Sequence, residues 1–242
     1  MADRSALVPA VVAGAIVALG VAAAGALIGK GVENARVGDR SVSVRGLSER
    51  VVKADLAVLP LRFATGGDEL SAVQTDIDAD LAVVRQFLAQ QGFKPSEVDL
   101  GQLQVTDQRA REYQSQEVGA RYVMAQTVIA RTTDVDRVQR TTRQLNDLVR
   151  QGVVLQDYRG PSYLFTKLND VRPAMIAEAT AAARKGAEQF ARDSGAHLGG
   201  IRSATQGSFE ILPRDEIGDD RGEPGQVYKR VRVVTTVSYR LR

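Results

Sequence analysis

The chain has 242 residues, 44% of them hydrophobic, which is enough for one large or two small domains with a hydrophobic core. It contains no Cys, which excludes disulfide bonds, thiolate metal sites and a cysteine nucleophile. The 32 Lys and Arg residues barely outnumber the 29 Asp and Glu residues, so the net charge of +3 argues against a general polyanion-binding protein.

The N-terminal segment is predicted to be a membrane anchor. Residues 7–28 form a run of 22 residues without a charge. A membrane-spanning helix needs about 20 such residues, whereas the apolar part of a cleavable signal peptide is usually ~7–15 residues long. We therefore expect residues 1–29 to be an uncleaved anchor, with a signal peptide as the alternative. Small residues spaced for close packing of membrane helices are candidates for helix contacts: Gly14, Ala18, Gly25 and Gly29.

Residues 30–40 are polar and contain Gly, which predicts a linker between the anchor and a folded domain over residues 41–242. The positive charges near the anchor point to a cytoplasmic domain, because Arg4 precedes the span while Lys30, Arg36 and Arg40 follow it. Long folded domains can be translocated regardless of such charges, so this indication is weak.

The domain opens with two strands and a helix. Residues 41–45 and 51–63 are rich in Val and Leu and predict strands around a turn at residues 46–50. Asp68 is the expected N-cap of the helix. Apolar residues at steps of three and four give its buried stripe: Leu70, Val73, Ile77, Leu81, Val84 and Leu88. Gly92 is expected to end it.

The middle of the domain continues with strands and a second helix. Leu100, Leu103 and Val105 predict a strand, and residues 122–130 predict a central one because apolar residues lie on both of its faces. A helix is expected over residues 134–150, and short strands over 153–158 and 162–168. The buried stripe of that helix is expected to be Val135, Val138, Leu145 and Leu148.

A third helix follows the stretch FTKLNDVRPAM, residues 165–175. Asn169 or Asp170 is the expected N-cap, and Pro173 is tolerated in a first turn because the amide groups there lack intrahelical partners. Such residues indicate a helix start rather than a site. The inward face is expected to consist mostly of small residues: Met175, Ala179, Ala182, Gly186 and Phe190.

The last two predicted strands cover residues 201–212 and 227–241, the second with clean alternation of apolar and polar residues. Strands mixed with helices and joined by hairpins indicate an α+β fold, with about three helices packed on antiparallel strands. The final strand is long, so we expect the hairpin of these two strands to extend beyond its own domain and to form an oligomer interface. The alternative is that the strand folds over its own helices and the domain is a monomer. The candidate interface residues are Val231, Val233, Val237 and Tyr239.

No motif predicts catalysis, a cofactor or a metal site. Asp76, Asp78 and Asp80 have calcium-loop spacing but lie within a predicted helix, and the motif lacks its Gly. The acidic loop at residues 215–223 indicates a solvated surface or at most a weak divalent-ion site. His197 is the only histidine, so it supports neither a zinc site nor, by itself, a catalytic triad. The basic YKRVRV stretch lacks the stacking aromatic residues of a nucleic-acid platform, so no nucleic acid is expected.

The sequence resembles the SIMPL-domain family of bacterial cell-envelope proteins. The most family-like stretches are SYLFTKLNDVRPAMIAEATAAARKGAEQFARDSGAHLGGIRSATQGSFEI and KRVRVVTTVSYRL, and SVSVRGLSERVVKADLAVLPLRF resembles the opening strands. The resemblance implies an α+β domain exported to the periplasm, ring-like oligomers in some members, and a link to oxidative-stress tolerance in others. It supplies no catalytic residues.

We therefore expect a single-pass inner-membrane protein whose C-terminal domain lies in the periplasm and acts by self-assembly, as a scaffold or ring-like homo-oligomer. A module that binds a small ligand or envelope polymer, or a hydrolase with an unrecognised site, are the alternatives. A pocket with converging polar groups would favour the alternatives.

Overall fold

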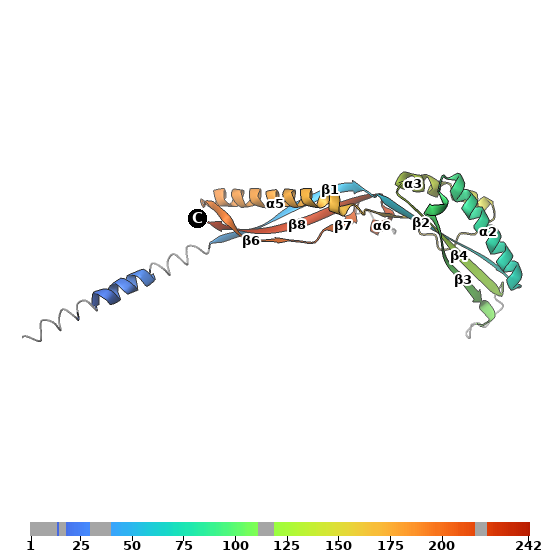
Figure 1. Ribbon diagram of the computed structural model, residues 1–242, viewed down its shortest axis with the longest axis horizontal. Helices are drawn as coiled ribbons and strands as arrows, with labels where there is room; N and C mark the ends of the chain where they lie inside the picture. The colour runs from blue at the N-terminus through green and yellow to red at the C-terminus, as the bar shows by residue number, and fades with distance from the viewer. Residues whose placement is uncertain (1–13, 15–17, 30–39, 111–118, 216–221) are drawn as a thin grey trace, which may run out of the picture. The chain divides into compact units, whose positions relative to one another are not determined.

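The computed structural model describes residue 14 and residues 18–29, 40–110, 119–215 and 222–242. Figure 1 shows the elements along the chain. The strands are β1 (Ser41–Lys53), β2 (Leu56–Gly67), β3 (Val98–Asp107), β4 (Tyr122–Thr132), β5 (Ser162–Leu164), β6 (Leu198–Gln206), β7 (Glu210–Pro213) and β8 (Tyr228–Leu241). The helices after residue 40 are α2 (Leu70–Gln90), α3 (Val135–Arg143), α4 (Asn146–Arg150), α5 (Leu168–Asp193) and α6 (Gly222–Gly225), with 3-10 turns η1 (Pro95–Glu97) and η2 (Gln108–Ala110).

These elements group into two compact units. The first comprises Met1–Ser48, Ala174–Ser208 and Val233–Arg242, and the second comprises Glu49–Pro173 and Phe209–Arg232. In the first unit β6 pairs antiparallel with β8, and in the second β2, β3, β4 and β5 form an antiparallel sheet. Helices pack on the strands of each unit, so the predicted α+β class with antiparallel strands is confirmed.

The predicted anchor is only partly covered by the described residues. Residues 18–29 are helical and every residue in this range is exposed. Within the ranges given above, no helix combines the length and the hydropathy that crossing a membrane requires. Residues 1–13 and 15–17 of the expected anchor, and residues 30–39 of the expected linker, lie outside the described residues. The anchor and the linker therefore stay predictions.

In the first unit, α5 lies along one face of the strands β1 and β8 (Figure 1). Residues of β1 alternate, so that Val42, Gly46 and Ser48 are buried while Ser43 and Leu47 are exposed. A small apolar cluster joins the helix to the strands: Val42, Ala183, Ala187, Val237 and Tyr239, with Val44, Leu198 and Leu241 partly buried against it.

The turn predicted at residues 46–50 is wrong, because β1 continues through it to Lys53. A Cβ atom at Gly46 would overlap the backbone oxygen of Ala179 and lie 2.5 Å from the backbone nitrogen of Ala183. The glycine is therefore needed where the strand meets the helix backbone, and not for a turn. β1 and β2 do not form the expected hairpin, since they belong to different sheets.

The buried face of α5 matches the prediction at Met175 and Ala179 and differs from it by one position after Ala179. Its buried residues follow a strict spacing of four: Met175, Ala179, Ala183, Ala187 and Ala191. The predicted Ala182 is exposed, and the predicted Phe190 is 51% exposed. On the outer side, Arg184 Nε donates to Glu188 Oε1 at 2.9 Å, a pair that the spacing of four residues on a helix brings together.

The start of α5 also differs from the prediction. The helix begins at Leu168, so Asn169 and Asp170 lie within its first turn and Pro173 is its sixth residue. A distant carboxylate holds the two residues before the helix: Asp55 accepts hydrogen bonds from the backbone N–H of Thr166 at 2.8 Å and of Lys167 at 3.1 Å. Its negative charge lies near the N-terminal end of α5, where the dipole of the helix favours it.

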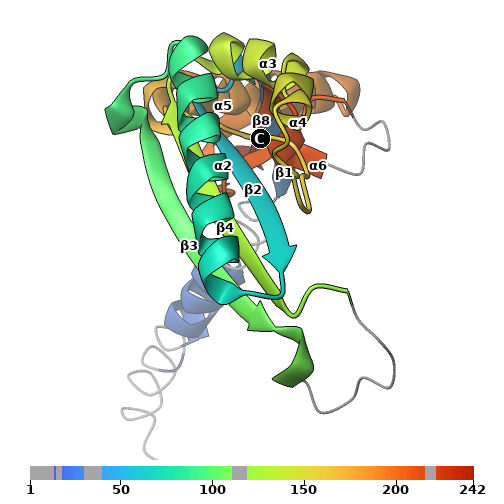
Figure 2. The ribbon, with the colours of Figure 1, turned by 90° about the vertical axis from the view of Figure 1, so that its right-hand side faces the viewer.

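In the second unit, α2 packs on one face of the sheet β3-β4-β2-β5 (Figure 2), and β4 is a central strand as predicted. Val73, Ile77, Val84 and Leu88 of α2 are buried as expected, whereas Leu70 is exposed. Asp68 is not the N-cap that the sequence predicts. Glu69 occupies that position, and Asp68 Oδ1 instead accepts from the backbone N–H of Arg121 at 3.1 Å.

The helix predicted over residues 134–150 is divided into α3 and α4 at residues 144–145. Its predicted stripe is nevertheless buried throughout: Val135, Val138, Leu145 and Leu148. Asp134 caps α3 by accepting from the backbone N–H of Arg137 at 3.0 Å. Of the short strands expected over 153–158 and 162–168, only β5 forms, together with a single bridge between Leu155 and Phe63.

The predicted strand over residues 201–212 is divided into β6 and β7, which both pair with β8. At the break, the backbone N–H of Gly207 donates to the carbonyl of Val234 at 2.8 Å. β8 shows the alternation that the sequence predicts, with every second side chain from Lys229 to Tyr239 buried.

The corrected face of α5 gives a first prediction. Replacing Ala183 by Leu should destabilise the protein by about 1–3 kcal/mol, because added methylene groups have no room beside β1 and β8. Ala182→Leu adds the same groups on the exposed face and should change stability by less than about 0.5 kcal/mol. Thermal unfolding followed by circular dichroism measures both, and equal melting temperatures for the two variants would contradict the assigned face.

The close contact at Gly46 gives a second prediction. Gly46→Ala forces the backbones of β1 and α5 apart and should lower the urea midpoint of unfolding clearly, at a cost of about 1–3 kcal/mol. Gly200→Ala in β6 is the control, since a Cβ atom there meets nothing within 4 Å. A Gly46→Ala midpoint as high as that of the control would show that the helix can move away freely.

Candidate functional site

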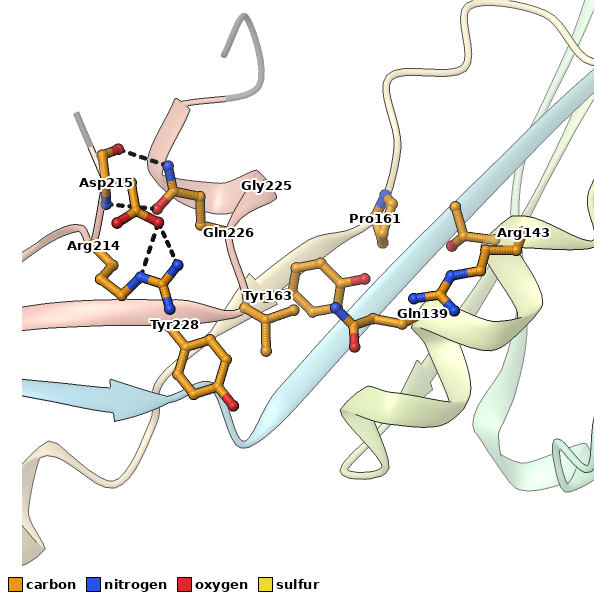
Figure 3. A pocket seen from close by; sticks show the side chains of 11 residues that line it. Gln139, Arg143, Pro161, Tyr163, Arg214, Asp215, Gly225, Gln226 and Tyr228 are labelled. Carbon is orange, nitrogen blue, oxygen red and sulfur yellow. Dashed lines mark hydrogen bonds and ion pairs between the residues drawn. The ribbon is translucent and has the colours of Figure 1, made fainter. Parts of the chain in front are cut away.

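A pocket of about 350 Å³ in the second unit gathers polar side chains from separate parts of the chain. Figure 3 shows side chains of α3 on one side, the Arg214–Asp215 pair on the other, and Tyr163 between them. Its lining consists of Gln139, Thr142, Arg143, Pro161, Tyr163, Arg214, Asp215, Gly225, Gln226, Val227 and Tyr228. Other hollows are larger, but they bring together fewer polar groups from different segments.

An ion pair forms one side of this pocket. Arg214 donates to Asp215 Oδ2 from Nε at 2.8 Å and from Nη2 at 2.6 Å. These hydrogen bonds hold the pKa of Asp215 below its usual value, so the carboxylate stays ionised and is a weak proton acceptor. The guanidinium also lies over the ring of Tyr228, 5.2 Å from its centre.

The side-chain amide of Gln226 fixes the backbone beside that pair. It accepts from the backbone N–H of Asp215 at 3.1 Å and donates to the carbonyl of Asp215 at 2.8 Å. Two hydrogen bonds to one residue align the segment after β7 with the start of β8. The position of Arg214 is therefore set before any ligand arrives.

The opposite side of the pocket comes from the last two turns of α3. Gln139 and Arg143 are four residues apart and so lie on the same face of the helix, with Thr142 beside them. The hydroxyl of Thr142 donates to the carbonyl of Val138 at 2.8 Å, so its proton is engaged within the helix. Arg143 is exposed at the mouth of the pocket.

The described lining residues supply groups that can bind a ligand: two guanidinium groups, two side-chain amides and two tyrosine rings. It contains no Ser, Lys, His or Glu, and its single carboxylate, Asp215, is paired with Arg214. A nucleophile activated by a neighbouring base needs both groups within hydrogen-bond reach. Among the described lining residues, no such pair occurs.

A second polar hollow, of about 410 Å³, lies around Asp55, Lys53 and Asp136. Lys53 Nζ donates to both carboxylate oxygens of Asp136, at 2.8 and 2.7 Å. Asp55 is occupied by the residues that precede α5. Each charged group in this trio has a structural partner, so the hollow is explained by the fold.

A hydrogen-bond network around Glu97 also connects elements of the fold and lines neither the pocket nor the hollow described above. Its carboxylate accepts from the backbone N–H of Lys94, from Thr132 Oγ1 at 2.6 Å and from Arg137 Nη1 at 3.0 Å. The hydrogen bond from Lys94, followed by that from Thr132, lowers the pKa of Glu97. The network ties η1 to β4 and α3.

The polar residues that the sequence singled out do not form a site among the described residues. Asp76, Asp78 and Asp80 lie on α2, where partial burial, and then the charge of Asp76, raise the pKa of Asp80. The backbone of His197 exchanges two hydrogen bonds with Arg242, at 2.8 and 2.9 Å. No group of three metal-ligating side chains was found in the part of the chain that the structure describes, and most of the acidic loop at 215–223 lies outside it.

The predicted interface residues are located inside the chain. Val231, Val233, Val237 and Tyr239 are 0–4% exposed. Val237 and Tyr239 pack against α5, in the cluster with Ala183 and Ala187. The expectation that they form an exposed contact face is therefore wrong, because their own chain already covers them.

The candidate residues for packing of the membrane helix lie at the edge of the described chain. Gly14, Ala18, Gly25 and Gly29 are helical and exposed. A Cβ atom at any of the three glycines would meet nothing within 4 Å. Their role in helix contacts stays a prediction.

The sequence predicts the strand β3 but not the exposed apolar surface that β3 forms at the edge of the sheet. Leu100, Leu103 and Val105 of β3 are 52%, 45% and 50% exposed. They pair with Val128, Gln126 and Met124 of β4, so all three share the face on which α2 packs. We call these three residues the β3 edge. Alternating apolar residues were the available signal, but only the strand order shows that β3 has no neighbour on its outer side among the described strands.

Comparison with known proteins agrees with this architecture. A search of curated proteins finds no match. The profile of the SIMPL family, described as "Protein of unknown function (DUF541)", matches residues 42–239. The match covers both compact units, including the β3 edge and the pocket lining. It confirms the resemblance that the strands and the third helix indicate, and the chain belongs to the SIMPL family.

Proposed function

We propose that this protein is a membrane-anchored component of the bacterial cell envelope that acts by self-association rather than by catalysis. The β3 edge is the observation that carries the proposal. Three large apolar side chains are half exposed on one strand at an open edge of a sheet. Soluble proteins usually avoid such an arrangement unless a partner covers it.

The composition of β3 supports a contact at this edge. Natural edge strands are often protected by Lys or Pro, and β3 has neither. An irregularity in its pairing with β4 falls between Leu100 and Leu103. The regular part, residues 103–107, contains Leu103 and Val105 and can pair with a further strand.

A second copy of the chain is the partner that fits this edge. Two identical edges can pair antiparallel about a two-fold axis, which continues the antiparallel order of the sheet in both chains. In that arrangement Leu103 and Val105 of one chain face the same residues of the other, and their apolar surface leaves water. The contact closes on itself and gives a dimer, from which larger assemblies would need a second surface.

The anchor and the location complete the proposal. Twenty-two uncharged residues precede the domain, and the family resemblance implies export. An inner-membrane anchor at residues 1–29, with the domain in the periplasm, would hold copies in one plane and raise their effective concentration. A weak edge contact is then sufficient for association.

The role of the β3 edge is tested by native mass measurement of the full chain extracted in detergent. Val105→Asp places a charge in the proposed contact and should shift the protein toward the monomer, because a buried unpaired carboxylate is costly. Val149→Asp is the matched control, since Val149 is 57% exposed, against 50% for Val105, but lies on α4. A Val105→Asp protein that keeps its assembly, or a wild type that is a monomer, would rule out this interface.

The anchor is tested by washing membranes of expressing cells with alkaline carbonate. An uncleaved span of this length should keep the protein in the membrane pellet as a chain of full mass. Replacing Ala18 and Val21 by Asp should release it, because charges within the span are costly. A shortened, soluble mature chain would show instead that residues 1–29 include a cleaved signal peptide.

A further inference from the structure

The pocket between α3 and the Arg214–Asp215 pair has an uncompensated positive charge. Two arginines and one aspartate line it, which leaves a net charge of +1. Asp215 accepts both hydrogen bonds from Arg214 at its Oδ2 oxygen, so the charges of this pair nearly cancel. Among the described residues, no ion pair or hydrogen bond engages the guanidinium of Arg143. An anion that reaches the pocket therefore finds Arg143 available.

Three apolar or aromatic residues, Pro161, Tyr163 and Val227, also line this pocket, and we call them the apolar floor. Tyr163 and Val227 are 4% and 8% exposed. Figure 3 shows the ring of Tyr163 between the two polar sides. Aromatic and proline rings favour a planar apolar group lying against them. The volume of about 350 Å³ is at the small end of the usual range for ligand pockets.

We propose that this pocket binds a small organic monocarboxylate with a flat apolar body. The carboxylate pairs with the guanidinium of Arg143, and the amide of Gln139 on the same helix face donates a further hydrogen bond. The apolar body lies on Tyr163 and Val227. Arg214 and Asp215 form the far wall, which Gln226 holds in place.

Other ligand classes fit the pocket less well. A cation meets two guanidinium groups and one carboxylate that is already paired. An inorganic anion would leave the apolar floor uncovered. A dianion such as a phosphate monoester favours two free arginines, whereas Arg214 already donates two hydrogen bonds to Asp215. One free guanidinium above an apolar floor matches a single carboxylate on an apolar body.

The experiment titrates benzoate into the full chain in a detergent without aromatic groups, by calorimetry and by saturation-transfer NMR of the ligand. Benzamide is the neutral analogue, and inorganic phosphate is the anion without an apolar body. We expect saturable binding of benzoate at millimolar concentrations, with benzamide and phosphate each weaker by about tenfold or more. Added salt should weaken benzoate binding, because the pocket is open to solvent.

Substitution of Arg143 locates the binding. Arg143→Gln should weaken benzoate binding by about tenfold and leave the weak binding of benzamide unchanged. Arg140→Gln is the control, because Arg140 is exposed on the same helix and does not line the pocket. The proposal is overturned if benzoate does not bind, if benzamide or phosphate binds as tightly, or if the two variants bind benzoate alike. Each result is independent of whether the chain self-associates.

Discussion

The contact between the backbones of β1 and α5 determines the structure of the first unit. At Gly46 no side-chain atom can fit between the strand and the helix, so the two elements approach as closely as their backbones allow. That distance requires small residues along the facing side of the helix, and four alanines supply them at a spacing of four. Once the helix is held there, Val237 and Tyr239 of β8 fill the space beside it. The dispersion contacts and the buried apolar surface of this unit therefore lie in a thin layer between helix and strands that contains few large side chains.

The sequence predicts the elements better than their faces and ends. The stripes of α2 and α3 follow from their spacing, because large apolar residues contrast with polar neighbours. On α5 this contrast is absent, since alanine occupies positions 181–183. The large apolar side chain of Phe190 suggests a buried position, but it is exposed, so the predicted face is displaced toward it. The contact that holds the chain before α5 was not predictable either, because Asp55 lies 111 residues from Thr166 in the chain. Local sequence shows where a helix can start but not which distant residue binds the backbone that precedes it.

The pocket illustrates why a site without a motif escapes prediction. Its polar groups come from α3, from the end of β7 and from the start of β8, which lie far apart in the sequence. The roles of the two arginines depend on their ion pairs, since Arg214 is bound to Asp215 whereas Arg143 is not. The sequence alone does not distinguish the two. The packing of β8 likewise depends on distant residues that the strand's own sequence does not show. An alternating strand of this length suggests an exposed apolar face, but α5 covers half of it and the partners of the strand cover its edges.

β3 differs from the other strands with an open edge in length, regularity and exposed side chains. β5 has three residues and is too short to hold a partner. β6 is exposed along most of its length, but two irregularities interrupt its pairing with β8, and Arg202 lies in the second of them. β1 carries charges at Arg45, Glu49 and Lys53 on its exposed side. β3 alone among these strands combines a regular segment with a row of exposed apolar side chains, so the protection that natural edges carry is weakest there.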